Sequence, residues 1–265
     1  HATNDADEVA AGTDPVGAFS PHVGRVLDVS DGGAVVLSGS DGIGLGGAFT
    51  LEARIYPAAV TVPDSSSSVI QHEIGSVSYD LGIRSDEDGN LLPYVRCSFA
   101  GGTTLDISAS PANAVMTDDW AHIAATLNLD TRRLRLYVNG LEVASTQMED
   151  SPSDSPSGMP STRIGGGFTG YIDEVRIWND VRTSGEIQSQ MDEMLNGDEA
   201  GLVAYLPFDD GGDSVMNVVY PRDWENGWQH AGTIVEPAEI IREEAIDYVA
   251  GDDRDSDGLD DVWEA

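Results

Sequence analysis

The sequence contains no lysine: its 13 basic residues are all arginine, whereas 47 residues are acidic. The formal net charge is therefore −34. Such a field repels nucleic acid and anionic membrane surfaces, which excludes both as partners, and it attracts divalent cations. A lysine-free acidic surface also resembles that of secreted halophilic or marine proteins. The composition therefore favours an extracellular, calcium-rich setting, with the protein secreted or held at a cell surface.

Cysteine and long apolar runs are scarce as well. The single Cys97 has no partner for an internal disulfide, and it lies in an alternating apolar stretch, which predicts a buried, inert thiol. The longest apolar runs are far too short to cross a bilayer, so we expect no membrane insertion. No signal peptide is visible, so in a secreted protein the signal would already have been removed from this chain.

The last thirteen residues contain the register D-x-D-x-D-G-x5-E, which is the spacing of an EF-hand-type calcium loop. Side-chain oxygens at alternate positions converge on one point, a glycine allows the sharp turn, and one backbone carbonyl completes the shell. The chain ends before the exit helix of a full EF-hand, so the loop resembles the short repeats of thrombospondin type 3 or dockerin modules. The predicted Ca²⁺ ligands are Asp253, Asp255, Asp257, the carbonyl of Leu259, Asp261 and Glu264.

The opening residues resemble the other half of such a repeat. The segment from Asp5 to Pro15 is similar to the closing part of a thrombospondin type 3-like repeat, with Asp5 and Glu8 at the ninth and twelfth loop positions. Two interpretations follow. The chain is one module cut from a tandem protein, which we favour, or its tail completes a calcium site with the head of a neighbouring copy.

Strand patterns dominate the middle of the chain. Apolar and polar residues alternate over 49–56, 121–127 and 134–143, and Asn139-Gly140 lies between two such runs. Asn-Gly between alternating segments is a strong hairpin signal, because both residues tolerate positive φ. Alternation with one polar face is typical of antiparallel sheets packed face to face. The sequence therefore predicts an all-β antiparallel sandwich.

Two segments have helical patterns. Thr183 and Glu186 form a capping box, followed by apolar residues at helical spacing as far as Asn196-Gly197. A weaker, acidic pattern over Ala238 to Val249 predicts a helical connector to the calcium loop.

Several motifs resemble, in order, those of LamG-like, concanavalin A-like jelly-roll domains. They are found in the segments 46–57, 119–126, 133–145, 170–178, 201–211 and 226–233. The resemblance implies a LamG-like jelly roll over residues 17–236. We expect the end of a calcium-binding repeat or linker at residues 1–16, and a helical connector with the EF-hand-like loop at residues 237–265.

The resemblance also implies calcium inside the sandwich. LamG-like domains often hold it near the strand that contains Asp173 and near the first turn, here Asp28 and Asp31. From the alternation, Asp173 shares the core-facing side with Val175 and Ile177, where an unpaired carboxylate costs several kcal/mol. The alternative is a hydrogen-bonded structural aspartate.

The sequence predicts no enzyme. The E-x-D-x-x-E pattern of glycosidases on this sandwich is missing, as are a zinc spacing among the histidines and a G-x-S-x-G elbow. Asp173 and Glu174 are adjacent, so they are expected on opposite faces of the sheet. We expect a binding module for glycan or protein ligands, with sugar stacking on Tyr220, Trp224 and Trp228. The first alternative is a structural subunit of a calcium-stabilised extracellular filament, stalk or surface layer, and the less favoured one is a glycoside-acting enzyme.

Overall fold

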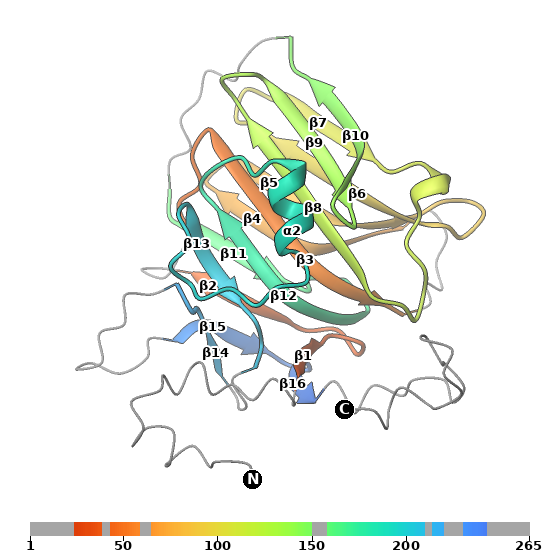
Figure 1. Ribbon diagram of the computed structural model, residues 1–265, viewed down its shortest axis with the longest axis vertical. Helices are drawn as coiled ribbons and strands as arrows, with labels where there is room; N and C mark the ends of the chain where they lie inside the picture. Colours follow the sequence, from red (N-terminus) through yellow and green to blue (C-terminus); the bar gives the residue numbers. More distant parts are fainter. Residues whose placement is uncertain are drawn as a thin grey trace.

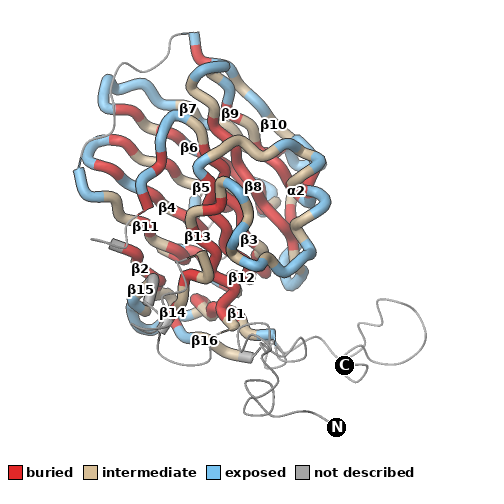
Figure 2. Tube along the Cα trace, turned by 60° about the vertical axis from the view of Figure 1, so that its left-hand side comes forward, coloured by how far each residue is buried: buried red, intermediate tan, exposed pale blue. Residues whose placement is uncertain are grey.

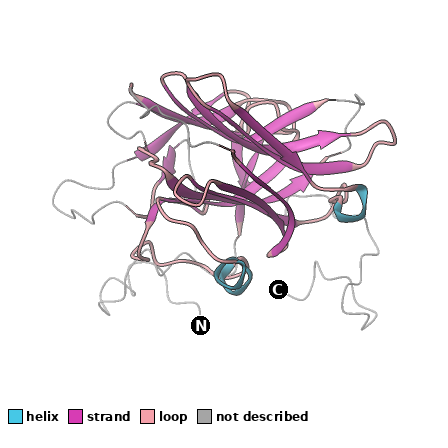
Figure 3. Cartoon of the chain, turned by 90° about the horizontal axis from the view of Figure 1, so that it is seen from above, coloured by secondary structure: helices cyan, strands magenta, loops and turns pink. Residues whose placement is uncertain are grey.

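The computed structural model describes residues 24–38, 43–58, 65–149, 158–209, 214–219 and 230–242. These residues fold into two eight-stranded antiparallel sheets that are stacked face to face (Figures 1 and 3). A short α-helix lies outside the sandwich, next to one sheet. The all-β jelly-roll sandwich with one short helix, predicted from the sequence, is confirmed.

The first sheet contains the strands that carry most of the recognised motifs. Its members are β1 (Arg25–Asp28), β3 (Ala48–Pro57), β8 (Ala121–Asn128), β9 (Arg133–Val138), β10 (Leu141–Gln147), β12 (Gly170–Trp178), β13 (Leu202–Leu206) and β16 (Glu239–Arg242). They are arranged in the order β10-β9-β8-β3-β12-β1-β16. Strand β13 pairs with the second half of β12, beyond the residues that pair with β1.

The second sheet is built from segments far apart in the sequence. Its members are β2 (Ala34–Ser38), β4 (Ser66–Ile74), β5 (Val77–Ser85), β6 (Leu91–Ser98), β7 (Thr104–Ser108), β11 (Pro160–Ile164), β14 (Ser214–Met216) and β15 (His230–Val235). Their order is β14-β15-β2-β11-β4-β5-β6-β7. A 3-10 turn, η2 (Pro111–Asn113), and the helix α2 (Ser184–Gln190) complete the described elements.

Apolar side chains from the facing sheets form one continuous core. Figure 2 shows buried residues along the strands of both sheets. On β3, Phe49, Leu51 and Ile55 point inward and are fully buried. Phe49 meets Tyr79 of β5 with the ring centroids 4.4 Å apart. Because side chains alternate along a strand, the residues between these positions lie on the outer faces of the sandwich.

Cys97 lies in this core, as predicted, and its thiol is fully buried. Burial raises the pKa of the thiol, and the nearby carboxylates of Asp80 and Asp106 raise it further. A thiol that stays protonated is a poor nucleophile, so Cys97 serves as a small apolar side chain.

The hairpin between β9 and β10 turns at the predicted Asn139-Gly140 pair. Asn139 has φ 47° and Gly140 has φ 74°, which is the left-handed geometry that a two-residue turn requires. Gly140 also lies against α2: a Cβ at this position would be 2.8 Å from the Cβ of Gln188. The glycine is therefore needed both for its backbone angle and for the close approach of the helix.

Helix α2 begins as predicted and ends earlier than predicted. The Thr183 side chain accepts a hydrogen bond from the Glu186 amide, and the Glu186 carboxylate accepts one from the Thr183 amide. The helix ends at Gln190, not at Asn196. The buried Arg176 guanidinium accounts for this, because it donates to the carbonyl oxygens of Gln190 and Glu193, each at 2.6 Å. A continued helix would use the Gln190 carbonyl in its own ladder.

The helical connector predicted from Ala238 is wrong over residues 239–242. These residues form the edge strand β16, which pairs with β1 and so adds to the first sheet beyond the domain boundary expected at residue 236. Ile240 packs against the core, and Ile241 packs against the opposite, aromatic face. Apolar neighbours on both faces, together with a free edge of β1, favour a strand there. Residues 243–249 lie outside the described residues.

Candidate functional site

A single row of directly opposed residues crosses the outer face of the second sheet. Their strand neighbours Val35, Leu37, Tyr79 and Thr162 are buried in the core, so the row itself faces outward. The row runs from β15 to β7 through Thr233, Val36, Arg163, Gln71, Asp80, Arg96 and Asp106.

A shallow pocket of about 200 Å³ lies on this face. Its lining comes from three adjacent strands: Val36 on β2, Ser161 and Arg163 on β11, and Gln71 and Glu73 on β4. The Gln71 side-chain amide donates to the Glu73 carboxylate at 3.2 Å, which holds these two side chains in a fixed relation. The pocket therefore offers a cation, an anion, an amide and a hydroxyl beside one apolar side chain.

A rigid cluster borders the pocket on β5, β6 and β7. The Tyr94 ring packs over Gly82, with the guanidinium carbons of Arg84 and Arg96 at 4.4 and 5.8 Å from its centroid. Both arginines are ion-paired to the same carboxylate, Asp106, at 2.6 and 2.8 Å. These contacts hold the two arginines and Asp106 together on the outer face next to the pocket.

The Tyr94 hydroxyl ties the cluster to the row. It donates to the Asp80 carboxylate at 2.7 Å. Burial, with Asp80 adding to it, raises the pKa of Tyr94, so the hydroxyl keeps its proton and remains a donor.

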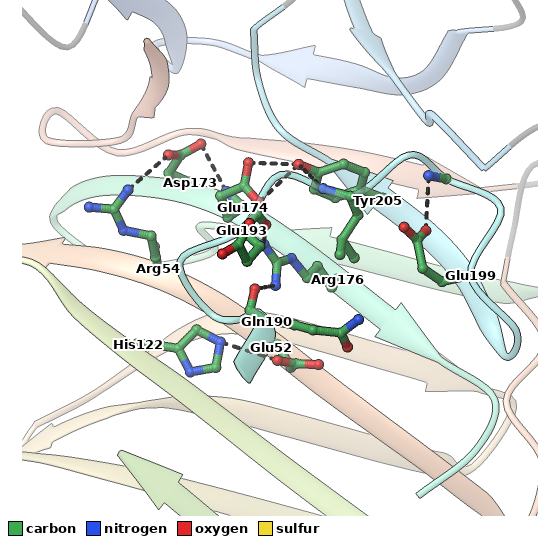
Figure 4. A network of polar contacts seen from close by, with 12 residues as sticks. Glu52, Arg54, His122, Asp173, Glu174, Arg176, Gln190, Glu193, Glu199 and Tyr205 are labelled. Carbon is green, nitrogen blue, oxygen red and sulfur yellow. Dashed lines mark hydrogen bonds and ion pairs between the residues drawn. The ribbon is translucent and has the colours of Figure 1, made fainter. Parts of the chain in front are cut away.

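The outer face of the first sheet carries a different polar network, shown in Figure 4. Arg176 is 1% exposed, and its guanidinium donates to the Glu174 carboxylate at 2.5 Å as well as to the carbonyls of Gln190, at the end of α2, and of Glu193, beyond it. Tyr205 of β13 donates to the same carboxylate at 2.8 Å. The segment after α2 covers this network, so its role is to fasten that segment to the sheet.

His122 and Glu52 form a second buried pair on this side. The His122 Nε2 atom lies 3.2 Å from the Glu52 Oε2 atom, and both side chains are at most 4% exposed. Neither residue is open to a ligand, so the pair has a structural role.

Asp173 does not lie where the alternation placed it. The pairing of β12 with β3 shifts register between Asp173 and Arg176, which marks a bulge, and Glu174 has φ 51°. The extra residue changes the phase of the strand, so Val175 faces the core whereas Asp173 lies opposite the outward Arg54. The predicted core-facing position of Asp173 is therefore wrong, and so is the prediction that alternation simply separates Asp173 from Glu174.

The Asp173 carboxylate has partners in its new place. It accepts a hydrogen bond from the Glu174 amide at 2.8 Å and lies 3.9 Å from the Arg54 guanidinium. Burial and the adjacent Glu174 carboxylate raise the pKa of Asp173 well above its usual range. The residue fits the alternative offered above, that of a hydrogen-bonded structural aspartate.

The other two residues predicted for a calcium site in the sandwich, Asp28 and Asp31, have different surroundings. Asp28 accepts a hydrogen bond from the Ser30 amide at 2.8 Å, and Asp31 is exposed. Within the described residues, no three acidic, histidine or cysteine side chains gather where they would hold a metal. Calcium at Asp28, Asp31 and Asp173 stays a prediction that this geometry does not support.

The remaining predicted site residues lie outside the described residues. They are the calcium ligands Asp5, Glu8, Asp253, Asp255, Asp257, Leu259, Asp261 and Glu264 and the aromatic residues Tyr220, Trp224 and Trp228.

A different set of aromatic rings lies on the outer face of the first sheet. The Tyr56 ring is 5.5 Å from Trp120 and 5.6 Å from Tyr171, centroid to centroid, with the planes inclined by 62° and 47°. The Arg54 guanidinium lies over the Trp120 ring at 4.7 Å. The inclined rings and the covering arginine leave no flat aromatic platform of the kind on which a sugar stacks.

Sequence reasoning missed the residues that line the pocket. Period-two alternation places Gln71 and Glu73 on one face of a strand, and this signal was available. The juxtaposition of Val36, Gln71 and Arg163 was not, because it depends on long-range pairing of β2, β11 and β4.

Comparison with known families agrees with this architecture. Residues 30–188 match a laminin G-type family described as the concanavalin A-like lectin/glucanases superfamily. The chain belongs to this superfamily. The match covers β2 to α2, and so includes every residue that lines the pocket.

Relatives share parts of the chain. Pappalysin-1 of Mus musculus is 27% identical over 145 residues, which cover 51% of this chain and 9% of that protein. A candidate carbohydrate binding protein from Bacteroides ovatus ATCC 8483 has a similar fold, with TM-score 0.59 and 19% identity over 83% of this chain and 60% of that one. Tailspike protein 2 of the Escherichia coli O157:H7 bacteriophage CAB120 has TM-score 0.50 and 15% identity, over 66% and 25%. The chain thus spans only part of the length of each of these proteins.

Proposed function

We propose that this domain is a non-catalytic glycan-binding module and that the pocket on the second sheet is its binding site. The observation that carries the proposal is the pocket lining. Donors and acceptors from Gln71, Glu73, Ser161 and Arg163 line the pocket together with the apolar Val36 side chain at one side of it. A sugar ring presents hydroxyls at its rim and C–H groups on its faces, so it needs this combination of polar groups with an apolar side chain.

The size of the pocket favours a short ligand. Sites for drug-sized ligands have volumes of roughly 300–1,000 Å³, whereas this pocket has about 200 Å³. One sugar ring, at the end of a chain or within it, fits that space. The descriptions of the superfamily and of the Bacteroides ovatus protein, which name lectins and carbohydrate binding, support the same ligand class.

We propose a non-catalytic role because the pocket, as far as the structure describes its lining, lacks a pair of carboxylates. Glycoside hydrolysis generally needs two carboxyl groups roughly 5–9.5 Å apart across the scissile bond. Among the described residues that line the pocket, Glu73 is the single carboxylate. Asp173 and Glu174 are adjacent but are engaged with Arg54, Arg176 and Tyr205 away from the pocket.

We also propose that the chain works outside the cell and that its flanks hold Ca²⁺. The support is the spacing of the aspartates from Asp253 to Glu264 and the net charge of −34. The described part of the chain has no helix long and apolar enough to span a membrane.

Filling the pocket tests the proposed function. Ser161→Tyr places a large side chain in the pocket. Thr104→Tyr places the same side chain on β7 at the far edge of the sheet, in the adjacent cross-strand row that runs from Ser161 to Thr104. On a glycan array, we expect the parent chain and the Thr104→Tyr variant to bind a common set of glycans, and Ser161→Tyr to lose them. Equal binding by both variants, or no binding by the parent chain, would refute the proposal.

A further inference from the structure

The charges on the outer face of the second sheet differ from those of the whole chain. The outward positions of β4, β5, β6, β7 and β11 carry three arginines, Arg84, Arg96 and Arg163, and three carboxylates, Glu73, Asp80 and Asp106. The face is locally balanced in a chain whose net charge is −34. An anionic ligand is thus not repelled at short range there as it would be elsewhere on this surface.

Arg163 differs from the other two arginines of this face. Arg84 and Arg96 are both ion-paired with the carboxylate of Asp106. The cross-strand neighbours of Arg163 are Val36 and Gln71, neither of which is charged. Among the ion pairs that join described residues, none includes Arg163, although the pocket contains the carboxylate of Glu73. Its guanidinium therefore keeps its charge and its donors available at the pocket wall.

Gly166 leaves room for the Arg163 side chain. Gly166 lies directly beside its stem: a Cβ at residue 166 would be 2.8 Å from the Arg163 Nε atom and 2.9 Å from its Cδ atom. Gly166 does not have a positive φ, so glycine is not required there for the backbone angle. Its missing side chain instead leaves the room in which the guanidinium lies, and an alanine would displace the end of Arg163 without straining the fold.

From these observations we infer that the pocket takes an acidic sugar, a pyranose that carries a carboxylate. Arg163 binds the carboxylate, and Ser161, Gln71 and Glu73 bind the hydroxyls of the same ring. A planar guanidinium matches a carboxylate with two parallel hydrogen bonds. The Glu73 carboxylate accepts hydrogen bonds from hydroxyls, so the hydroxyl-bearing side of the sugar ring faces Glu73 and the sugar carboxylate faces Arg163. Gly166 is a positioning residue for Arg163. This inference rests on the proposed glycan-binding function and names its ligand class.

Two kinds of acidic sugar have this chemistry, the hexuronates and the sialic acids. The experiment uses methyl glucuronide against methyl glucoside, which differ by carboxylate for hydroxymethyl, and a methyl sialoside against its carboxyl-reduced form. Titration calorimetry with the 265-residue chain measures each dissociation constant. We expect one acidic member to bind at least about tenfold more tightly than its neutral partner, because hydrogen bonds to charged groups contribute most.

Three variants and a small anion complete the test. Arg163→Gln and Gly166→Ala should each abolish the preference for the acidic sugar, whereas Arg133→Gln, which removes an exposed charge from β9, should keep it. Equal affinity for both members of each pair, unchanged by Arg163→Gln, would overturn the acidic-sugar assignment and leave glycan binding intact. Acetate competing as well as the sugar would reduce the site to a simple anion site and overturn the assignment too. No binding of any sugar would overturn the proposed function with it.

Discussion

The buried histidine His72 makes the protein sensitive to a change of pH. His72 of β4 lies in the core, where its Nδ1 atom shares a hydrogen bond of 2.8 Å with the Thr162 hydroxyl and its ring stacks on Tyr79. Burial lowers the pKa of His72 from 6.5 to about 4. The folded protein therefore holds the neutral imidazole at pH values where the unfolded chain already binds a proton.

We predict that this histidine makes the sandwich acid-sensitive. His72 is neutral when deprotonated, and its pKa is lower in the folded protein than in the unfolded chain. Its contribution to the free energy of unfolding is therefore complete above pH 6.5 and is lost as the pH falls through 6.5 toward 4. The loss amounts to at most about 3.5 kcal/mol, since one pKa unit is roughly 1.4 kcal/mol. Urea unfolding at pH 7, 5.5 and 4.5 measures it.

The matched control replaces both partners. His72→Phe with Thr162→Val removes the titrating group and its hydrogen bond together, so no buried polar atom is left without a partner. Its free energy of unfolding should fall less between pH 7 and 4.5 than that of the parent chain. Parallel curves for the two proteins would show that His72 does not set the acid sensitivity.

Helix α2 illustrates, at the level of an element, what local sequence can and cannot predict. Its start follows from the capping box of Thr183 and Glu186, which involves only neighbouring residues. Its end at Gln190 depends on Arg176, which lies on β12 and reaches the carbonyls only in the folded protein. Apolar periodicity continues past Gln190, so the sequence alone predicts a longer helix.

The cap supports a testable prediction. Thr183→Ala removes the side chain that accepts the Glu186 amide, and loss of such a cap usually costs about 1 kcal/mol. We expect a loss of this size in the free energy of unfolding, measured by denaturant titration. Ser189→Ala, a change on the same helix at an exposed position, should have less than half that effect. A Thr183→Ala variant as stable as the parent would contradict the role of the cap.

Two strands show how tertiary context overrides pattern. Residues 239–242 have apolar residues that fit a helix, but the free edge of β1 and apolar neighbours on both faces make them a strand. On β12, one inserted residue at Glu174 reverses which face each later residue takes. The sequence shows the alternation but not the bulge, so alternation alone predicts the wrong face for Asp173.

At the scale of the molecule, the motifs predicted the fold and not the candidate site. Five of the six recognised motifs fall on the first sheet, in β3, β8, the β9–β10 hairpin, β12 and β13. The pocket lies on the second sheet, where β2, β11 and β4 meet across more than 120 residues of sequence. Hydrophobic pattern fixes which face of each strand is buried, but neighbours in a sheet follow from long-range pairing.

The flanks give a prediction for the whole chain. The strands β1 and β16 are neighbours, with Arg25 opposite Arg242, so both flanks join the sandwich at one edge. Replacing Asp255 and Asp257 by alanine should remove one calcium site in a titration, since each supplies a carboxylate to the predicted loop. A control that changes Asp130 and Asp192, far from the loop in sequence, should leave the stoichiometry unchanged. An unchanged count in the loop variant would contradict the assignment.

The pocket as the glycan site is the central claim, and backbone NMR tests it most directly. A ¹⁵N-labelled chain is titrated with the glycan that binds best on the array, and amide shifts are mapped on the fold. We predict that the largest shifts fall on β2, β4 and β11, at Val36, Gln71, Glu73, Ser161 and Arg163. Amide shifts that are largest around Trp120 and Tyr171 on the first sheet, or on the flanks, would contradict the account.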